Sequence, residues 1–453
     1  MLNHIIAMLG IMTILTALIH ILAVAWSKFD LDREAVRKTL HVVMGTITLS
    51  FPWIFHETWP VVALSIISSL FLAAIKISSQ NKWRTVVLAP GRKSVGEVCF
   101  PIAVGLTFVL ADGDPFLFVA PIAALTYADA VSAIIGMRFG RRKFSTLDGQ
   151  KSSEGSLAFL VTAFTTTLVI ALVPGTGAML MPTEAIVLAL IVSVIAMLFE
   201  GISWMGLDNL LIPLGAYYAI ITHDHLPLPA MYLSLAALAL IALGFVLLRN
   251  RSTLTGSAVM AVVLFSYFAF HTGGPLFVLS PAALFLSYKY LMPKRFRDLK
   301  NLHSLYGVLT IAAAGTFWIL LARGDSGMAS STEVSFYLFP YSLTFGAHAA
   351  IIATAHLRYQ KLDRYRLKVL AAAVGKAWCL TCMTCLPYMA FFKNPEMILL
   401  YLFLAPVAIA VPTLMFYLLN ANRLAGTTRP ARWLKQASFA SLGSALGLLP
   451  LLI

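Results

Sequence analysis

The chain has 453 residues, of which 60% are apolar and only 11% charged, and its mean hydropathy is +0.86. Soluble globular domains carry about 25% charged residues, so this composition excludes a soluble domain and indicates an integral membrane protein. The formal net charge of +14 does not imply a nucleic-acid partner, because the cations lie between apolar segments, as in multi-pass membrane proteins.

Apolar segments of roughly 20 residues, the length that crosses a bilayer as a helix, recur along the whole chain. They are continuously apolar rather than alternating, which predicts helices rather than barrel strands. We therefore expect an all-α, polytopic transmembrane bundle of about 14 to 16 spans. The predicted spans are 4–26, 40–56, 60–78, 97–112, 115–136, 156–173, 184–200, 208–222, 228–248, 255–270, 274–292, 303–322, 334–356, 369–391, 396–419 and 436–453.

Lysine and arginine are concentrated in alternate loops between these spans. The loops that hold 30 of the 33 cations are 27–39, 76–93, 137–155, 249–254, 289–302, 357–368 and 420–435. Cytoplasmic loops are enriched in these residues, so the pattern predicts an N-terminus outside the cell and these loops inside. The first span, whose cations follow it, is expected to be a retained anchor. No targeting segment is evident, so the expected location is the plasma (inner) membrane, with the active site facing the cytoplasm.

The acidic residues divide the chain near residue 245. Before this point acids occur within apolar spans or at their ends, whereas beyond it the few acids fall in predicted loops. We therefore expect a catalytic membrane domain over 1–245 and a second helical membrane unit of unknown role over 246–453.

Two basic groups open predicted spans in the first domain. Arg37, Lys38 and His41 are three and four residues apart, so they share one face of a helix and could hold phosphate oxygens. The segment from Gly91 to Glu97 opens the fourth span, where Glu97 suits the positive end of a helix dipole. A helix cap with a charged flank explains this second group equally well.

Asp129 lies about nine residues, or 13 Å of helix, inside the cytoplasmic end of its span. An ionised side chain within a bilayer costs roughly 2.5–3.5 kcal/mol or more, so such a residue usually has a partner or a function. Because Mg²⁺ binds carboxylates together with substrate phosphates, Asp129 is a candidate metal ligand. A structural ion pair is the alternative.

The loop that follows Asp129 combines glycines with cations. Its glycines permit close backbone approach, and Ser152 or Ser153 is a suitable N-cap for the next helix, whose N-terminus would attract phosphate. Neither a Walker A motif nor GxGxxG is present, so no P-loop or Rossmann site is implied. The candidate nucleotide-binding residues of this region are Gly136, Arg138, Gly140, Arg141, Ser152 and Gly155.

Glu200, Asp208 and Asn209 bracket a short predicted cytoplasmic turn that contains no cation. This absence suggests that the acids serve a metal, although Asp208 alone could cap a helix. Phosphoryl transfer needs acids to hold Mg²⁺, cations to neutralise phosphates and a base to accept the hydroxyl proton. The acceptor is expected to be a lipid because the site opens onto the bilayer.

At these residues the chain resembles the dolichol kinase and phytol kinase family, CTP-using polyprenol kinases of membranes. The resemblance spans about residues 30–222 and implies transfer of the γ-phosphate of CTP to an isoprenoid alcohol such as phytol, geranylgeraniol, polyprenol or dolichol. One departure is Ala128 before Asp129, where many relatives have glycine. The elements that carry the resemblance are Arg37-Lys38-x-x-His41, Gly96 to Pro101, Asp129-Ala130 with Gly136, Phe139 and Gly140, Lys151-Ser152 with Glu154-Gly155-Ser156, and Glu200 with Asp208-Asn209-Leu210 and Pro213.

By this resemblance, nucleotide and metal binding falls to Asp129, Lys151, Glu154 and Asp208. In our hypothesis the base is His41 or a metal-held carboxylate. Mg²⁺ or Mn²⁺ would be held by Asp129, Glu200 and Asp208, and CTP is the expected phosphoryl donor. The remaining residues expected to contact the nucleotide are Arg37, Lys38 and Asn209.

Two other functions remain open from the sequence. CTP:phosphatidate cytidylyltransferases share an Asp, a similar glycine turn and a Lys-Thr-x-Glu-Gly element, but this chain lacks their Ser-Pro-Lys-Lys-Thr lead-in before Lys151. That difference favours a kinase. A transporter of phosphorylated lipids would explain the large number of spans, yet it should carry polar groups near mid-membrane, whereas these acids gather at one face.

Overall fold

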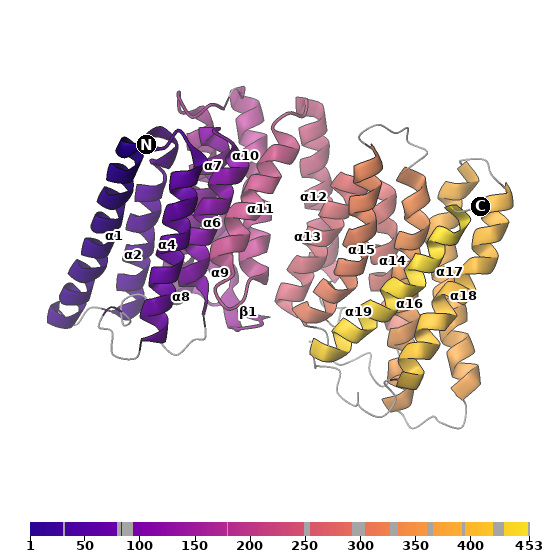
Figure 1. Cartoon of the computed structure of the whole chain (residues 1–453). Helices are drawn as coiled ribbons and strands as arrows, with labels where there is room; N and C mark the ends of the chain where they lie inside the picture. Colours follow the sequence, from indigo (N-terminus) through magenta and orange to yellow (C-terminus); the bar gives the residue numbers. More distant parts are fainter. Residues whose placement is uncertain are drawn as a thin grey trace. The chain divides into compact units, whose positions relative to one another are not determined.

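The computed structural model describes residues 1–29, 32–78, 83, 94–178, 180–248, 254–291, 304–326, 334–359, 366–391, 395–419 and 430–451. Its packing divides the chain into two compact units, Met1–Ala236 and Ala237–Ile453. The division falls within helix α12 (Leu228–Leu248), whereas the sequence placed it near residue 245. Figure 1 shows the helices of each unit.

Unit 1 is a helical bundle with one small hairpin in its described part. Between α8 and α9 the chain forms two antiparallel strands, which pair Lys143 with Ser152 and Thr146 with Gly149. The elements of unit 1 are α1 (Leu2–Phe29), α2 (Arg33–Thr48), α3 (Phe51–Ile54), α4 (Thr58–Ile77), α6 (Gly96–Ala111), α7 (Pro115–Ala123), a π-helical turn (Ala124–Ala128), α8 (Asp129–Phe139), β1 (Lys143–Thr146), β2 (Gly149–Ser152), α9 (Ser153–Leu172), α10 (Pro182–Ile202), α11 (Asp208–His223) and the start of α12.

Small residues set the helix contacts of this bundle. Gly105 of α6 lies against Ser65 of α4, and a Cβ at Gly215 of α11 would overlap the ring of Phe199 on α10. Close backbone approach through glycine and serine is the usual way in which helices associate in lipid, where apolar side chains gain little from leaving their surroundings.

Unit 2 is built around α16, which packs against α14, α15, α17, α18 and α19. Tyr341, Leu343 and Ala347 of α16 are completely buried. The helices of this unit are α13 (Gly256–Gly273), α14 (Pro275–Leu291), α15 (Leu305–Ser326), α16 (Val334–Tyr359), α17 (Arg366–Phe391), α18 (Pro395–Leu419) and α19 (Pro430–Ala445), followed by a 3₁₀ turn (Leu446–Leu451).

The predicted fold class is confirmed: the chain is an all-α polytopic bundle. Within the described residues, ten helices are long and apolar enough to cross a membrane, fewer than the 14 to 16 predicted spans. Each predicted span overlaps a helix, but α2 and α6 have only 16 residues. Such helices are about 24 Å long, which is shorter than the hydrocarbon core of about 30 Å.

Candidate functional site

Charged side chains from seven elements gather at one end of unit 1. They come from the N-terminal parts of α2, α6, α8 and α11, from the C-terminal ends of α4 and α10, and from β2. In Figure 1 the hairpin with β1 lies at the lower end of this unit and the N-terminus at the upper end. The folded chain thus brings together residues that are up to about 170 positions apart.

The centre of this cluster is a buried ion pair between α2 and α8. The Nζ of Lys38 donates to Oδ2 of Asp129 at 2.5 Å, and the two side chains are only 8% and 15% exposed. The Nε2 of His41 lies 3.9 Å from the same carboxylate oxygen. The sequence assigned Lys38 to the phosphates and left a structural ion pair open for Asp129; the structure pairs these two residues with each other.

The imidazole of His41 is held in a defined orientation. Its ring lies edge-on to Phe100 of α6, with the ring centroids 5.2 Å apart. The His41 ring forms a hydrogen bond with the backbone of Leu125, whereas its buried Nε2 has no hydrogen-bond partner. Nε2 is therefore the nitrogen that is available to accept a proton, next to the Asp129 carboxylate.

The π-helical turn brings Asp129 against α2. Thr126 in this turn packs onto Gly45 so closely that a Cβ at Gly45 would overlap its side chain. The hydroxyl of Tyr127 also contacts the Thr46 hydroxyl at 3.1 Å. π-Helical turns are rare and are frequently found at functional sites. Asp129 follows this turn directly, and hydrophobic periodicity gave no sign of the turn.

A second ion pair joins the hairpin to the end of α10. The Nζ of Lys151 donates to Oε1 of Glu200 at 2.6 Å and to the Glu200 carbonyl at 2.5 Å, so it also satisfies a carbonyl in the last turn of the helix. Burial of Lys151 favours its neutral form, but the negative charges of Glu200 and Asp208 outweigh this effect and raise the pKa of Lys151 above its usual value. The other Glu200 oxygen, Oε2, is buried without a hydrogen-bond partner.

Local hydrogen bonds build the hairpin that presents Lys151. Ser152 is the N-cap of α9 and accepts from the Gly155 N–H at 3.1 Å, which confirms one of the two predicted caps. The Glu154 carboxylate accepts from the Arg142 backbone N–H at 3.1 and 3.2 Å. In the folded chain Glu154 therefore fixes the loop; whether it also contacts a nucleotide stays a prediction.

The predicted nucleotide-binding glycines have a packing role in the structure. Gly136 of α8 lies against Gly155 of α9, and a Cβ at Gly140 would approach Ser152 Oγ to 2.7 Å. These glycines let the hairpin and α9 rest directly on α8. The nearby cations Arg138 and Arg141 are exposed, so they are accessible to an anionic ligand.

The N-termini of α6 and α11 are joined beside this site. Asn209 donates to the Gly96 carbonyl at 2.8 Å, and Gly206, with φ +83°, fits tightly against Gly96. Asp208 accepts from the Asn209 N–H at 3.0 Å and forms no ion pair within the described residues. Asn209 thus holds two helices together, while Asp208 can still interact with a ligand.

Other predicted residues lie at the edge of the cluster. Arg37 forms a two-pronged ion pair with Glu34, at 2.5 and 3.1 Å. Lys76 of α4 donates to the Ser94 carbonyl and lies 3.7 Å from Glu97. The sequence analysis did not single out Lys76; its position as a lone cation at the end of an apolar helix was the available signal. The predicted basic residues Arg92 and Lys93, with Gly91, lie outside the described residues.

The predicted metal ligands do not form a ready-made metal site. In the part of the chain that the structure describes, no three His, Cys, Asp or Glu side chains converge for an ion. Asp129 and Glu200 are each neutralised by a lysine. This arrangement fits Mg²⁺ only in the form in which substrate phosphates and water supply most of the ligands.

Comparison with known proteins shows that the chain is similar to a phytol kinase. That protein, from Synechocystis sp., is 26% identical to this chain over 189 residues, which are 40% of this chain and 76% of the relative. No family model matches the chain, and no solved structure matches it. This similarity agrees with the resemblance to phytol kinases expected from the sequence. It leaves the relations to dolichol kinases and cytidylyltransferases as predictions.

Proposed function

We propose that this protein transfers the γ-phosphate of CTP to the hydroxyl of an isoprenoid alcohol at the cytoplasmic end of unit 1. One observation carries the proposal. A buried carboxylate, Asp129, lies between the Lys38 ammonium and the unpaired Nε2 of His41, in a chain similar to a phytol kinase. A base, an acid and cations in one place are what phosphoryl transfer to an alcohol requires.

His41 is the proposed general base. Nε2 takes the proton of the alcohol as its oxygen attacks the γ-phosphorus; the bond between this phosphorus and the β,γ-bridging oxygen breaks, and CDP leaves. The imidazolium formed in this step lies 3.9 Å from Asp129, whose negative charge stabilises it. The products are CDP and a lipid monophosphate.

Lys151, Glu200 and Asp208 form the proposed nucleotide side of the site. The pKa of Lys151 is raised, so it remains a cation and can neutralise phosphate charge. Glu200 Oε2 and the Asp208 carboxylate are the oxygens that would hold Mg²⁺ or Mn²⁺ bound with the nucleotide. When bound, the ion supplies further charge neutralisation for the γ-phosphate.

Arg138 lies in the last turn of α8 and Arg141 in the segment that follows it. Both side chains are exposed and would attract the triphosphate from solution. Cationic loops on this side agree with a cytoplasmic orientation, and the N-terminus lies at the opposite end of unit 1 (Figure 1). We therefore propose a multi-pass protein of the plasma membrane whose site draws nucleotide from the cytoplasm and alcohol from the bilayer.

A paired label assay tests this function. Purified protein in detergent with Mg²⁺ receives CTP labelled in either the γ- or the α-phosphate, together with phytol, geranylgeraniol, polyprenol, diacylglycerol or phosphatidate. We expect lipid label from γ-labelled CTP only, and only with an isoprenoid alcohol. Label from α-labelled CTP would instead establish a cytidylyltransferase. If neither CTP nor ATP labels any lipid, the kinase proposal is wrong and transport of phosphorylated lipids becomes the function to test.

A further inference from the structure

Four exposed cations mark the place where the chain leaves α8 and enters the β1–β2 hairpin. Arg138 lies in the last turn of α8, Arg141 and Arg142 follow the helix, and Lys143 begins β1. Within the part of the chain that the structure describes, none of the four forms an ion pair, whereas the lysines of the candidate site are each paired with a carboxylate. We call these four residues the basic surface; the hairpin that carries it lies at the lower end of unit 1 in Figure 1.

The backbone that carries the basic surface is held by hydrogen bonds. The Arg142 N–H donates to the Glu154 carboxylate, and the Arg142 carbonyl accepts from the Ser153 N–H at 2.8 Å. Phe144 is buried, and successive side chains of a strand point to opposite sides, so Lys143 is directed away from the protein. The cations are therefore displayed by an ordered backbone.

An exposed apolar stripe on α8 leads to the basic surface. Val131, Ile134 and Met137 are three residues apart, so they share one face of the helix, and all three are exposed. Met137 and Phe139, on either side of Arg138, are 61% and 62% exposed. In a multi-pass protein such side chains contact lipid acyl chains. The lipid-facing surface of α8 thus extends to the first of the cations.

Helix α9, which returns from the hairpin and packs against α8, shows the same boundary. Its first residue, Ser153, is exposed and polar, and the exposed apolar residues Leu157 and Val161 follow on one face. From Ser153 to Leu157 is about 6 Å of helix. Both helices therefore change from apolar to polar exposed residues at the hairpin, which places the basic surface at the level of the lipid head groups.

Cations beside exposed apolar side chains fit one class of partner, the anionic phospholipid. Its phosphate carries the charge that the cations lack as a partner, and its acyl chains meet the apolar residues. The long stems of arginine and lysine can lie along an apolar surface while the charged ends reach the head groups. A nucleotide needs no apolar residues of this kind, and a zwitterionic lipid offers no net negative charge.

We propose that the basic surface binds the head groups of anionic phospholipids in the adjacent leaflet, with the acyl chains along Met137 and Phe139. This interaction does not depend on the proposed kinase function, because no step of it involves phosphate transfer. Arg138 and Arg141 are also the cations proposed to attract the triphosphate. The test therefore uses Arg142 and Lys143, which have no role in that proposal.

The test is native mass spectrometry of the full-length protein in detergent, mixed with phosphatidylglycerol or phosphatidylcholine. We expect the wild type to bind phosphatidylglycerol in preference. Each basic residue near an anionic leaflet contributes roughly a factor of five, so Arg142→Gln with Lys143→Gln should weaken this binding roughly 5- to 30-fold. The matched control is Lys28→Gln with Lys435→Gln, which removes the same charge from exposed positions on α1 and α19 and should bind like the wild type.

Photo-crosslinking locates the bound lipid. Phosphatidylglycerol with a diazirine near the head-group end of one acyl chain should label the segment from Val131 to Lys143 in the wild type, and this label should fall in the Arg142→Gln, Lys143→Gln variant. Both side chains are exposed, and the Arg142 N–H that bonds Glu154 is kept, so the variant should unfold at the wild-type temperature.

Each outcome decides the proposal. A loss of phosphatidylglycerol binding in the hairpin variant alone, with label on the segment from Val131 to Lys143, supports it. Equal losses in the hairpin and control variants, no preference over phosphatidylcholine, or label confined to other segments would overturn it. Unchanged lipid binding together with weaker binding of CTP in the hairpin variant would also overturn it, and would assign these cations to the nucleotide instead.

Discussion

Replacing Lys38 and Asp129 singly and together separates their structural role from their proposed catalytic role. Both side chains are buried, and their charged atoms are 2.5 Å apart. At an effective dielectric constant of about 20, their attraction is about 7 kcal/mol. Removing one partner leaves the other charge buried and should lower the free energy of unfolding by about 3–5 kcal/mol, whereas replacing both with apolar residues is often nearly neutral.

The variants are Lys38→Met, Asp129→Leu and the double variant, each measured by thermal unfolding in detergent and by phosphate transfer to geranylgeraniol. Both single variants should unfold at a clearly lower temperature, and the double variant should recover most of this loss. Turnover should fall by at least about 100-fold in all three, because the positioned acid and base groups are disrupted. A double variant with wild-type turnover would refute a catalytic role for the pair and leave it a structural one.

Three further predictions follow from the same contacts. His41→Ala should reduce turnover by about 10²–10⁴-fold when it is compared with the wild type at equal amounts of folded protein, and normal turnover in this variant would remove His41 as the base. Lys151→Met should lower the free energy of unfolding by about 2–4 kcal/mol because it leaves Glu200 unpaired. The pKa of Lys151 is raised in the folded protein, so the stability that this lysine contributes is complete below the ordinary pKa of 10.5 and is lost only as the pH rises through the higher folded value. The difference in unfolding temperature between Lys151→Met and the wild type should therefore be constant from about pH 7 to 9. Gly45→Ala should displace α2 from the π-helical turn and destabilise the fold by about 1–3 kcal/mol. Gly10 of α1 has open space around it, so Gly10→Ala is the control and should not destabilise the fold. Equal effects at both positions would contradict the packing described for Gly45.

The parts of this fold that depend on local sequence could be predicted. Continuous apolar segments are sufficient to place helices, because a bilayer leaves few alternatives for the backbone. The N-cap of α9 was narrowed to Ser152 or Ser153, of which the structure uses Ser152, since a cap depends on neighbouring residues only. The number of full-length spans was harder to predict, because hydropathy does not reveal where a helix such as α6 ends within the bundle.

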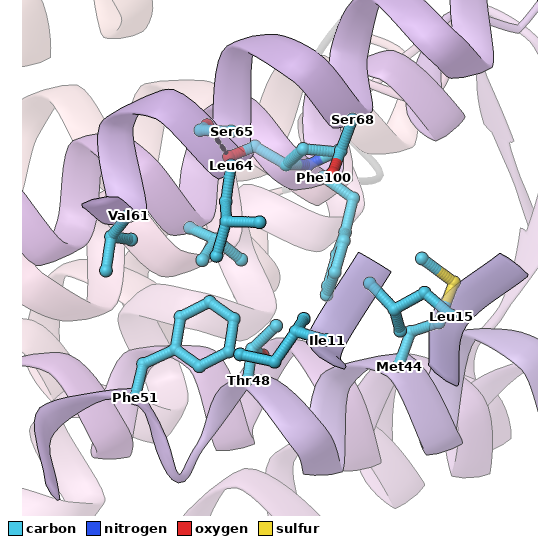
Figure 2. Close-up of a pocket in the computed structure, with 12 residues that line it drawn as sticks. Ile11, Leu15, Met44, Thr48, Phe51, Val61, Leu64, Ser65, Ser68 and Phe100 are labelled. Carbon is cyan, nitrogen blue, oxygen red and sulfur yellow. Dashed lines mark hydrogen bonds between the residues drawn. The ribbon is translucent and has the colours of Figure 1, made fainter. Parts of the chain in front are cut away.

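The parts that depend on packing between distant helices could not be predicted. The sequence placed Lys38 and His41 on one helix face and marked Asp129 separately, but their meeting depends on the packing of α2 against the π-helical turn at Gly45. The small apolar pocket between α1, α2, α3, α4 and α6 (Figure 2) could not be foreseen for the same reason, because its lining comes from five separate elements. The sequence likewise could not show that Gly136 packs against Gly155, because this contact depends on the position of α9.

The central claim is that the site around Asp129 transfers the γ-phosphate of CTP to an isoprenoid hydroxyl. The most direct measurement is the formation of geranylgeranyl monophosphate from γ-labelled CTP by the purified wild-type protein and by Asp129→Asn, at equal amounts of folded protein. We predict labelled product with the wild type and none with Asp129→Asn. Equal product from both proteins, or no product from the wild type, would contradict the claim.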